Sequence, residues 1–139
     1  MHYLTVQDVL WIHLQIAKKP GKFSFANLEE ATSYQYAYGK SHNFLAQAAR
    51  FFGGFATKAP FDSANRAVAF AAGIVFLELN GYQLNPEEND LVAWLAKASI
   101  VATIEGSTTR TEHAHVASSR DVAQNVLDKY ASTIKMLTE

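Results

Sequence analysis

The fold is decided at residues 67–79, where the chain reads AVAFAAGIVFLEL. Residues 68–77 carry no polar side chain, so a helix formed there is apolar on every side. Such a helix is typical of one that other helices enclose. The stretch is too short to cross a bilayer, which takes about 20 apolar residues. We therefore expect a buried central helix at 68–77.

Segments on both sides of this stretch carry apolar residues at helical spacing. Helix starts are predicted from capping residues at Thr5, Asn27, Ser41 or Asn43, Asn85 and Ser118. Helix ends are predicted at Pro20 and Gly21, at Gly39 and at Gly81. Loops are expected at 57–64 and at 106–119, the second with a short extended piece, and a last helix is expected over 119–138. The sequence predicts an all-α, single-domain chain of about six helices around the central one.

Composition narrows the functional classes. The chain has 139 residues, a net charge of −1 and no cysteine, which excludes disulfides, thiol nucleophiles and cysteine-bound zinc. Lys and Arg are scattered, so no basic stripe suggests a nucleic-acid partner. The first residues lack the charged and apolar regions of a signal peptide. A cytoplasmic location without membrane association is expected.

The loop before the central helix, residues 58–66, is the segment best suited to chemistry. The first N–H groups of a helix are unpaired and attract anions. Small residues at 63 and 64 would let a ligand approach the backbone, and Lys58 and Arg66 add positive charge. The same residues also suit an ordinary helix connection anchored by its Pro and Phe, and both interpretations stay open at this point.

Four pieces of the chain together resemble the Fic and Doc (death-on-curing) family. The family motif runs His-Pro-Phe-x-acidic-Gly/Ala-Asn-Lys/Gly-Arg, and residues 59–67 here read APFDSANRA. A helix ending in Phe-Leu-x-x-Asn-Gly follows it, as FLELNG does at 76–81. Residues 4–13 (LTVQDVLWIH) and 28–31 (LEEA) resemble the first two helices of Doc-type chains. The resemblance covers roughly residues 4 to 100.

The resemblance implies transfer of a nucleoside monophosphate or a phosphate onto a protein hydroxyl, with a nucleotide and Mg²⁺. The motif histidine would be the base, the acidic residue would hold the metal and the final arginine would clamp a phosphate. This chain has Ala59, Ser63 and Ala67 at those positions. It therefore offers no catalytic residue and no metal ligand, and its cofactor is left unassigned. Candidate substrate-binding groups are Lys58, Asn65 and Arg66, and Pro60 and Phe61 are the structural part of the motif.

The leading hypothesis is a catalytically inactive Fic/Doc relative, derived from the toxin of a toxin–antitoxin pair. Such a protein would bind a small antitoxin-like partner that lays a helix or extended segment across it. A second hypothesis is an active transferase that uses Asp62, Asn65 and Arg66 instead. A third is an unrelated helical interaction protein. The oligomeric state is left open.

Three histidines outside the loop are candidate metal ligands or bases. His13 lies on the apolar stripe of the first helix, and we expect it to be a hydrogen-bonded core residue. His113 and His115 stand two apart, which does not place them on one helix face. Only Glu112 is adjacent to them, so a loop position is expected rather than a metal site.

Overall fold

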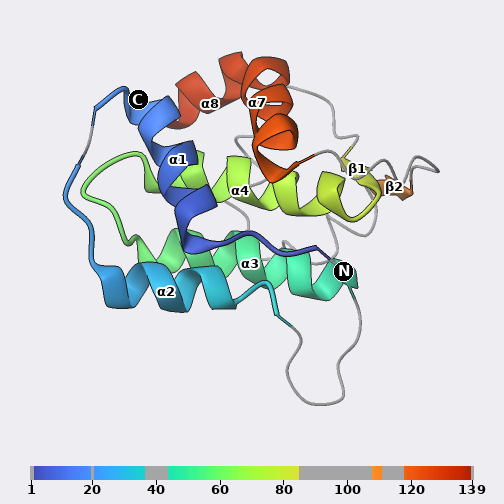
Figure 1. Ribbon diagram of the computed structural model, residues 1–139, viewed down its shortest axis with the longest axis horizontal. Coiled ribbons are helices and arrows are strands. Elements are labelled where there is room, and N and C mark those ends of the chain that lie inside the picture. The colour runs from blue at the N-terminus through green and yellow to red at the C-terminus, as the bar shows by residue number, and fades with distance from the viewer. Residues whose placement is uncertain (1, 20, 37–43, 85–107, 111–117, 139) are drawn as a thin grey trace.

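A computed structural model describes residues 2–19, 21–36, 44–84, 108–110 and 118–138. In these ranges the chain forms six helices and two three-residue strands (Figure 1). The helices are α1 (Val6–Ala17), α2 (Phe25–Ser33), α3 (Phe44–Lys58), α4 (Asn65–Leu79), α7 (Ser119–Lys129) and α8 (Ala131–Thr138). The strands β1 (Tyr82–Leu84) and β2 (Thr108–Arg110) pair antiparallel, which confirms the predicted extended piece. The prediction of an all-α bundle is confirmed.

Helix α4 is the centre of the fold. Every residue from Val68 to Leu77 is buried, as the sequence predicted. In Figure 1 it runs through the middle of the molecule, with α2 and α3 on one side and α1, α7 and α8 on the other. Four helices, α1, α3, α7 and α8, pack directly on it, while α2 packs on α1 and α3. The core is therefore built around α4.

Two glycines let helices approach closely. A Cβ atom on Gly73 would lie 2.2 Å from Phe52 Cε1, and one on Gly54 would lie 2.5 Å from Tyr34 Cδ2. No side chain fits at such distances, so glycine at 73 lets the Phe52 ring rest directly against the backbone of α4. Because α3 is packed in this way, it continues through its glycines to Lys58. The loop therefore begins at residue 59, and the predicted start at Thr57 was wrong.

Caps confirm some predicted boundaries and correct others. Thr5 and Ser118 cap α1 and α7 as expected. Helix α2 begins earlier than predicted, because Ser24 is its cap and accepts a hydrogen bond from the N–H of Asn27. The single helix expected over 119–138 is broken at Tyr130, whose φ of −109° is not helical. The break lets both α7 and α8 pack on α4.

The N-terminal segment is held by two side-chain amides that pair with it as a peptide group would. The Gln35 amide accepts from Leu4 N at 2.8 Å and donates to Leu4 O at 2.6 Å. The Asn80 amide accepts from His2 N and donates to His2 O, both at 2.8 Å. Asn80 therefore has a structural role here, next to Gly81, whose φ of 82° ends α4 as predicted.

Several predicted features lie outside the described residues. They are the caps at Ser41 and Asn43, the helix start at Asn85 and the pair His113 and His115. The helix end predicted at Gly39 was wrong, because α2 ends at Ser33 and residues 34–36 are not helical. Among the helices that the structure describes, none has the length and apolar character needed to cross a membrane.

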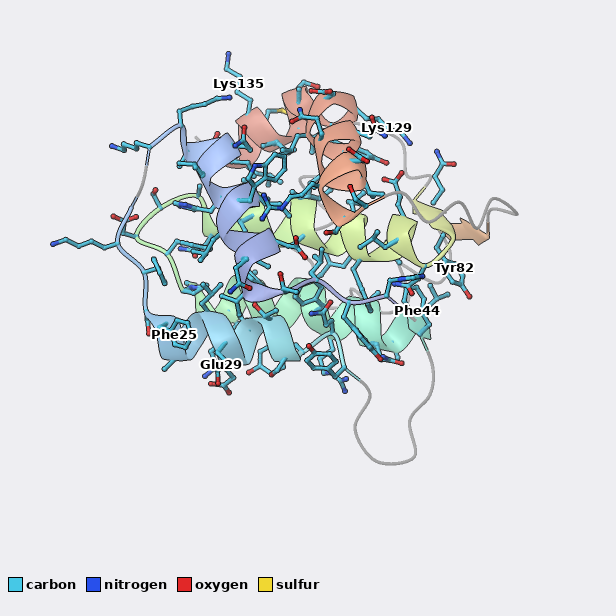
Figure 2. The ribbon with its side chains drawn as sticks, viewed as in Figure 1. Phe25, Glu29, Phe44, Tyr82, Lys129 and Lys135 are labelled. Carbon is cyan, nitrogen blue, oxygen red and sulfur yellow. The ribbon has the colours of Figure 1, made fainter. Side chains whose placement is uncertain are left out.

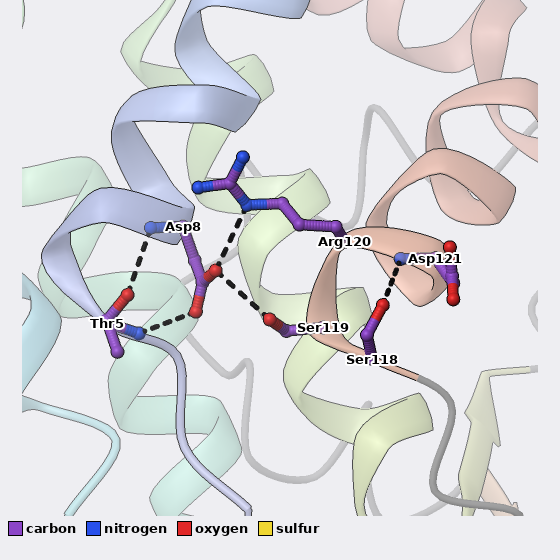
Figure 3. A network of polar contacts seen from close by, with 6 residues as sticks. All are labelled: Thr5, Asp8, Ser118, Ser119, Arg120 and Asp121. Carbon is purple, nitrogen blue, oxygen red and sulfur yellow. Dashed lines mark hydrogen bonds and ion pairs between the residues drawn. The ribbon is translucent and has the colours of Figure 1, made fainter.

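A polar network fastens the start of α7 to the start of α1 (Figure 3). Asp8 Oδ1 accepts hydrogen bonds from Ser119 Oγ at 3.0 Å and from Arg120 Nε at 3.3 Å. Asp8 Oδ2 accepts from Thr5 N at 2.9 Å, which completes the capping box of α1. The Arg120 guanidinium also lies 5.2 Å from the centre of the Trp11 ring. One carboxylate thus serves a helix cap and a contact between helices.

Removal of the Asp8 carboxylate should destabilise the fold more than removal of an exposed one. Burial raises the pKa of Asp8, but its hydrogen bonds outweigh this and hold the pKa below the ordinary value of 3.8. The ionised group therefore stabilises the fold above that pH, and its contribution is lost as the pH falls through the lowered pKa. Asp8→Ala should cost about 1–2 kcal/mol of unfolding free energy at pH 7.

Urea unfolding checks this, with Asp121→Ala as the matched control. Asp121 occupies the corresponding position in the first turn of α7, but its side chain is exposed. We expect the control to cost about 0.5 kcal/mol through the helix dipole. Equal losses for the two variants would contradict the assigned role of Asp8, as would an Asp8→Ala deficit that does not shrink below pH 3.8.

Candidate functional site

The loop from Ala59 to Ala64 turns sharply at both ends. Ala59 has a φ of 43° and Ala64 a φ of 62°, which is left-handed backbone at residues other than glycine. Such a conformation costs roughly 1–2 kcal/mol per residue. It persists only when surrounding contacts fix it. Between the two turns, Pro60 and Phe61 are buried, whereas Asp62 and Ser63 are exposed.

Asn65 closes the loop from the inside. Its Oδ1 accepts a hydrogen bond from Phe61 N at 2.9 Å, and its Nδ2 donates to Phe61 O at 2.8 Å. The side chain therefore uses both ends of its amide on one residue of the loop. Asn65 was predicted to bind substrate, but in this arrangement it holds the loop in shape.

The segment 22–24 covers one edge of the loop. Ser24 N donates to Pro60 O at 2.8 Å, and Asp62 N donates to Lys22 O at 3.1 Å, in an antiparallel bridge. The Asp62 carboxylate accepts in addition from Lys22 N at 3.3 Å. This pairing has no signal in the sequence. A segment of three residues is too short to show a strand pattern, and its partner lies 40 positions away in the chain.

His13 lies directly against the loop's aromatic anchor. Its ring and that of Phe61 are stacked 3.9 Å apart at an angle of 7°. Both side chains are buried, at 4% and 5% exposure, and the centres of the Phe55 and Phe61 rings lie 6.4 Å apart. The prediction that His13 belongs to the core is confirmed, but its Nε2 is buried without a hydrogen-bond partner. Burial lowers the pKa of His13, against the opposing effects of the Ser63 backbone and the charge of Asp62.

The predicted basic groups point to different places. Lys58 Nζ lies 2.9 Å from Glu30 Oε2, and the Tyr34 hydroxyl also bonds to Glu30. This pair raises the pKa of Lys58 and lowers that of Glu30, and it joins the end of α3 to α2. Arg66 is exposed in the first turn of α4 and forms no ion pair within the described ranges. Lys58 and Asn65 are therefore engaged within the protein, whereas Arg66 is exposed.

A cavity of about 590 Å³ lies beside the loop. Its lining combines the exposed face of the loop with the end of α1 and the segment after it: His13, Ala17, Lys19, Gly21, Lys22, Asp62 and Ser63. A Cβ on Gly21 would lie 2.6 Å from Asp62 Oδ1, so a larger residue there would displace the Asp62 carboxylate. Two lysines beside one carboxylate could attract a small anion, but none of the three predicted substrate-binding residues lines this space. Lys19 and Lys22 flank the predicted helix end at Pro20 and Gly21, and no motif in the sequence marks them as a site.

The described part of the chain contains no cluster of three or more His, Asp or Glu placed to hold a metal ion. Comparison with protein-family models, with curated proteins and with solved structures found no match to this chain. The Fic/Doc resemblance therefore stays a hypothesis that rests on the motifs themselves.

The buried position of His13 should make stability sensitive to mild acid. The lowered pKa means that the unfolded chain takes up a proton before the folded one does. Stability is then lost as the pH falls from the ordinary value of 6.5 through the lower folded-state pKa. His13→Phe keeps an aromatic ring on Phe61 and removes the proton site, so it should lose less stability over that range than the wild type.

Chemical denaturation between pH 7.5 and 5 measures the free energy of unfolding of both proteins. One proton site can change this free energy by at most about 1.4 kcal/mol per pH unit. His2→Gln is the control, because His2 is exposed and is held only through its backbone. The control should keep the wild-type pH dependence. A His13→Phe curve parallel to that of the wild type would contradict this expectation, because it would show that folding does not change the proton affinity of His13.

Proposed function

We propose that this chain is a non-catalytic binding protein with a Fic/Doc-like fold, in which the signature loop serves structure. The observation that carries this is the loop's internal closure. Asn65 is committed to the Phe61 backbone, and Ala59 stands where the family has its base. A loop that satisfies its own polar groups has few left for a substrate.

Among the residues that the structure describes, the imidazole that packs against the loop does not supply the missing base. Ala59 is exposed and cannot accept a proton. His13 is the imidazole packed against the loop, but it is stacked on Phe61 and its Nε2 is sealed from solvent. A base must come within hydrogen-bond reach of the hydroxyl it activates. In this arrangement the buried Nε2 of His13 is not within reach of such a hydroxyl.

The metal ligand and the phosphate clamp of the motif are also replaced by residues that cannot do their work. Ser63 stands at the position of the metal-binding acid, and a hydroxyl does not neutralise Mg²⁺ as a carboxylate does. Ala67 is completely buried, so the position of the phosphate clamp here faces the core. Phosphoryl-type transfer depends mainly on positioning and charge neutralisation. The base, the metal ligand and the phosphate clamp are therefore all replaced, which supports the proposal that catalysis is lost.

The alternative is an active transferase that uses Asp62, Asn65 and Arg66. The cavity beside Asp62, with its two lysines, is the observation in its favour. Against it, the carboxylate of Asp62 and the amide of Asn65 already bond within the protein. Under the leading proposal the chain acts in the cytoplasm by holding a partner, and the family resemblance suggests a small antitoxin-like protein.

A transfer assay tests the proposal. The purified chain is incubated with ATP labelled on the α- or the γ-phosphate, Mg²⁺ and a cell extract. We expect no labelling above that of the extract alone from the wild type or from Ala59→His, although a base alone contributes about 10²- to 10⁴-fold. The returned histidine would face a phosphate chain without metal ligand or clamp.

The double change Ala59→His with Ser63→Asp is the stronger attempt at rescue, and it avoids placing a charge at the buried position 67. Circular dichroism verifies that each variant is folded. Labelling by the wild type, abolished by Arg66→Ala, would overturn the proposal and favour the active transferase. Labelling by Ala59→His alone would show that the loop binds nucleotide despite its closure.

A further inference from the structure

A second surface, which shares no lining residue with the cavity beside the loop, exposes aromatic side chains to solvent. A groove of about 390 Å³ runs between the start of α1 and α2. Phe25 and Tyr36, near the two ends of α2, both line it and are 60% and 40% exposed. Exposed aromatic rings that gather at a groove are typical of binding surfaces rather than of ordinary protein surface.

The groove has the length of a short helix. Phe25 and Tyr36 are 11 residues apart along α2 and its end, which corresponds to about 16 Å at helical rise. A partner helix of about three turns has the same length and would present one side chain per turn. The two aromatic rings would then act as the anchors at its ends.

Gln7 adds an exposed amide to the groove, but two of the hydroxyls in its lining are engaged within α2. The Thr32 hydroxyl donates to Leu28 O at 2.7 Å, and the Ser33 hydroxyl donates to Glu30 O at 2.6 Å. Both hydroxyls therefore bond to their own helix. Leu4 and Val6 add apolar surface from the segment leading into α1. Recognition here would come from apolar contact.

Glu29 is the charged residue of the groove lining. Figure 2 shows it beside Phe25 at the outer edge of α2, projecting away from the rest of the fold. Its neighbour Glu30 is paired with Lys58, whereas Glu29 has no ion pair in the ranges that the structure describes. An exposed carboxylate between two aromatic anchors favours an occupant with a cation at its centre.

We propose that this groove docks an amphipathic helix of a partner protein, with apolar side chains on Phe25 and Tyr36 and a Lys or Arg on Glu29. The inference rests on the proposed function, since it supplies the surface through which a non-catalytic protein acts. Charge excludes two other occupants. A nucleic acid would bring phosphates to Glu29, and a two-fold dimer through the groove would bring two Glu29 carboxylates together.

Two synthetic peptides of about 12 residues provide the test. Both are amphipathic helix formers with one Leu per turn, and they differ only in carrying Lys or Glu at the centre of the apolar stripe. Fluorescence anisotropy should show saturable binding of the basic peptide and about tenfold weaker binding of the acidic one, a difference of about 1.4 kcal/mol. Glu29→Lys should reverse the preference, and Phe25→Ala should weaken the basic peptide about tenfold or more.

Asp121→Lys makes the same charge change at an exposed position on α7 and should leave the preference unaltered. Absence of saturable binding, or a preference that Glu29→Lys does not change, would overturn the inference. Self-association of the free protein that Phe25→Ala abolishes would also overturn it, because the occupant would then be a second copy. The peptides do not involve the 59–66 loop, so this result and the transfer assay can fail separately.

Discussion

The burial of α4 on every side is the constraint from which the rest of the structure follows. A helix without a polar face must be covered all round, and α1, α3, α7 and α8 supply that cover. Close contact with α3 requires glycine at 73, where the Phe52 ring leaves no room for a Cβ. The same constraint explains the break at Tyr130. Two short helices, α7 and α8, both pack on α4, whereas one straight helix over the same residues would extend away from it.

The loop before α4 is fixed from three directions. Asn65 bonds to the Phe61 backbone, the 22–24 segment pairs with its outer edge, and His13 stacks on the Phe61 ring. These contacts offset the left-handed turns at Ala59 and Ala64, which without them would relax. A loop held in this way leaves few polar groups free to react with a substrate. This supports the proposed function, in which binding takes place at the separate aromatic groove on α2.

Local patterns in the sequence predicted the parts of the fold that local physics decides. The all-apolar run, the caps at Thr5 and Ser118 and the left-handed Gly81 each depend on a few neighbouring residues. The parts that were missed depend on residues far apart in the chain. The pairing of 22–24 with the loop, and the cavity beside it, have no local signature for this reason. The role of Asn65 has a different cause: its partner Phe61 is only four residues away, but a polar amide before a helix suits a ligand as well as it suits the loop backbone.

Amide hydrogen exchange at Phe61 and Asp62 tests most directly whether the loop is closed, because each N–H donates one of the hydrogen bonds that hold it. Phe61 N donates to the Asn65 side chain, and Asp62 N donates to Lys22 O. If the loop is a closed structural unit, both amides should exchange slowly, with protection near that of α4. Asn65→Ala should then speed exchange at Phe61 first. Exchange of both amides at the rate of an open loop in the wild type would contradict the account, because the groups that close the loop would be free to bind a substrate.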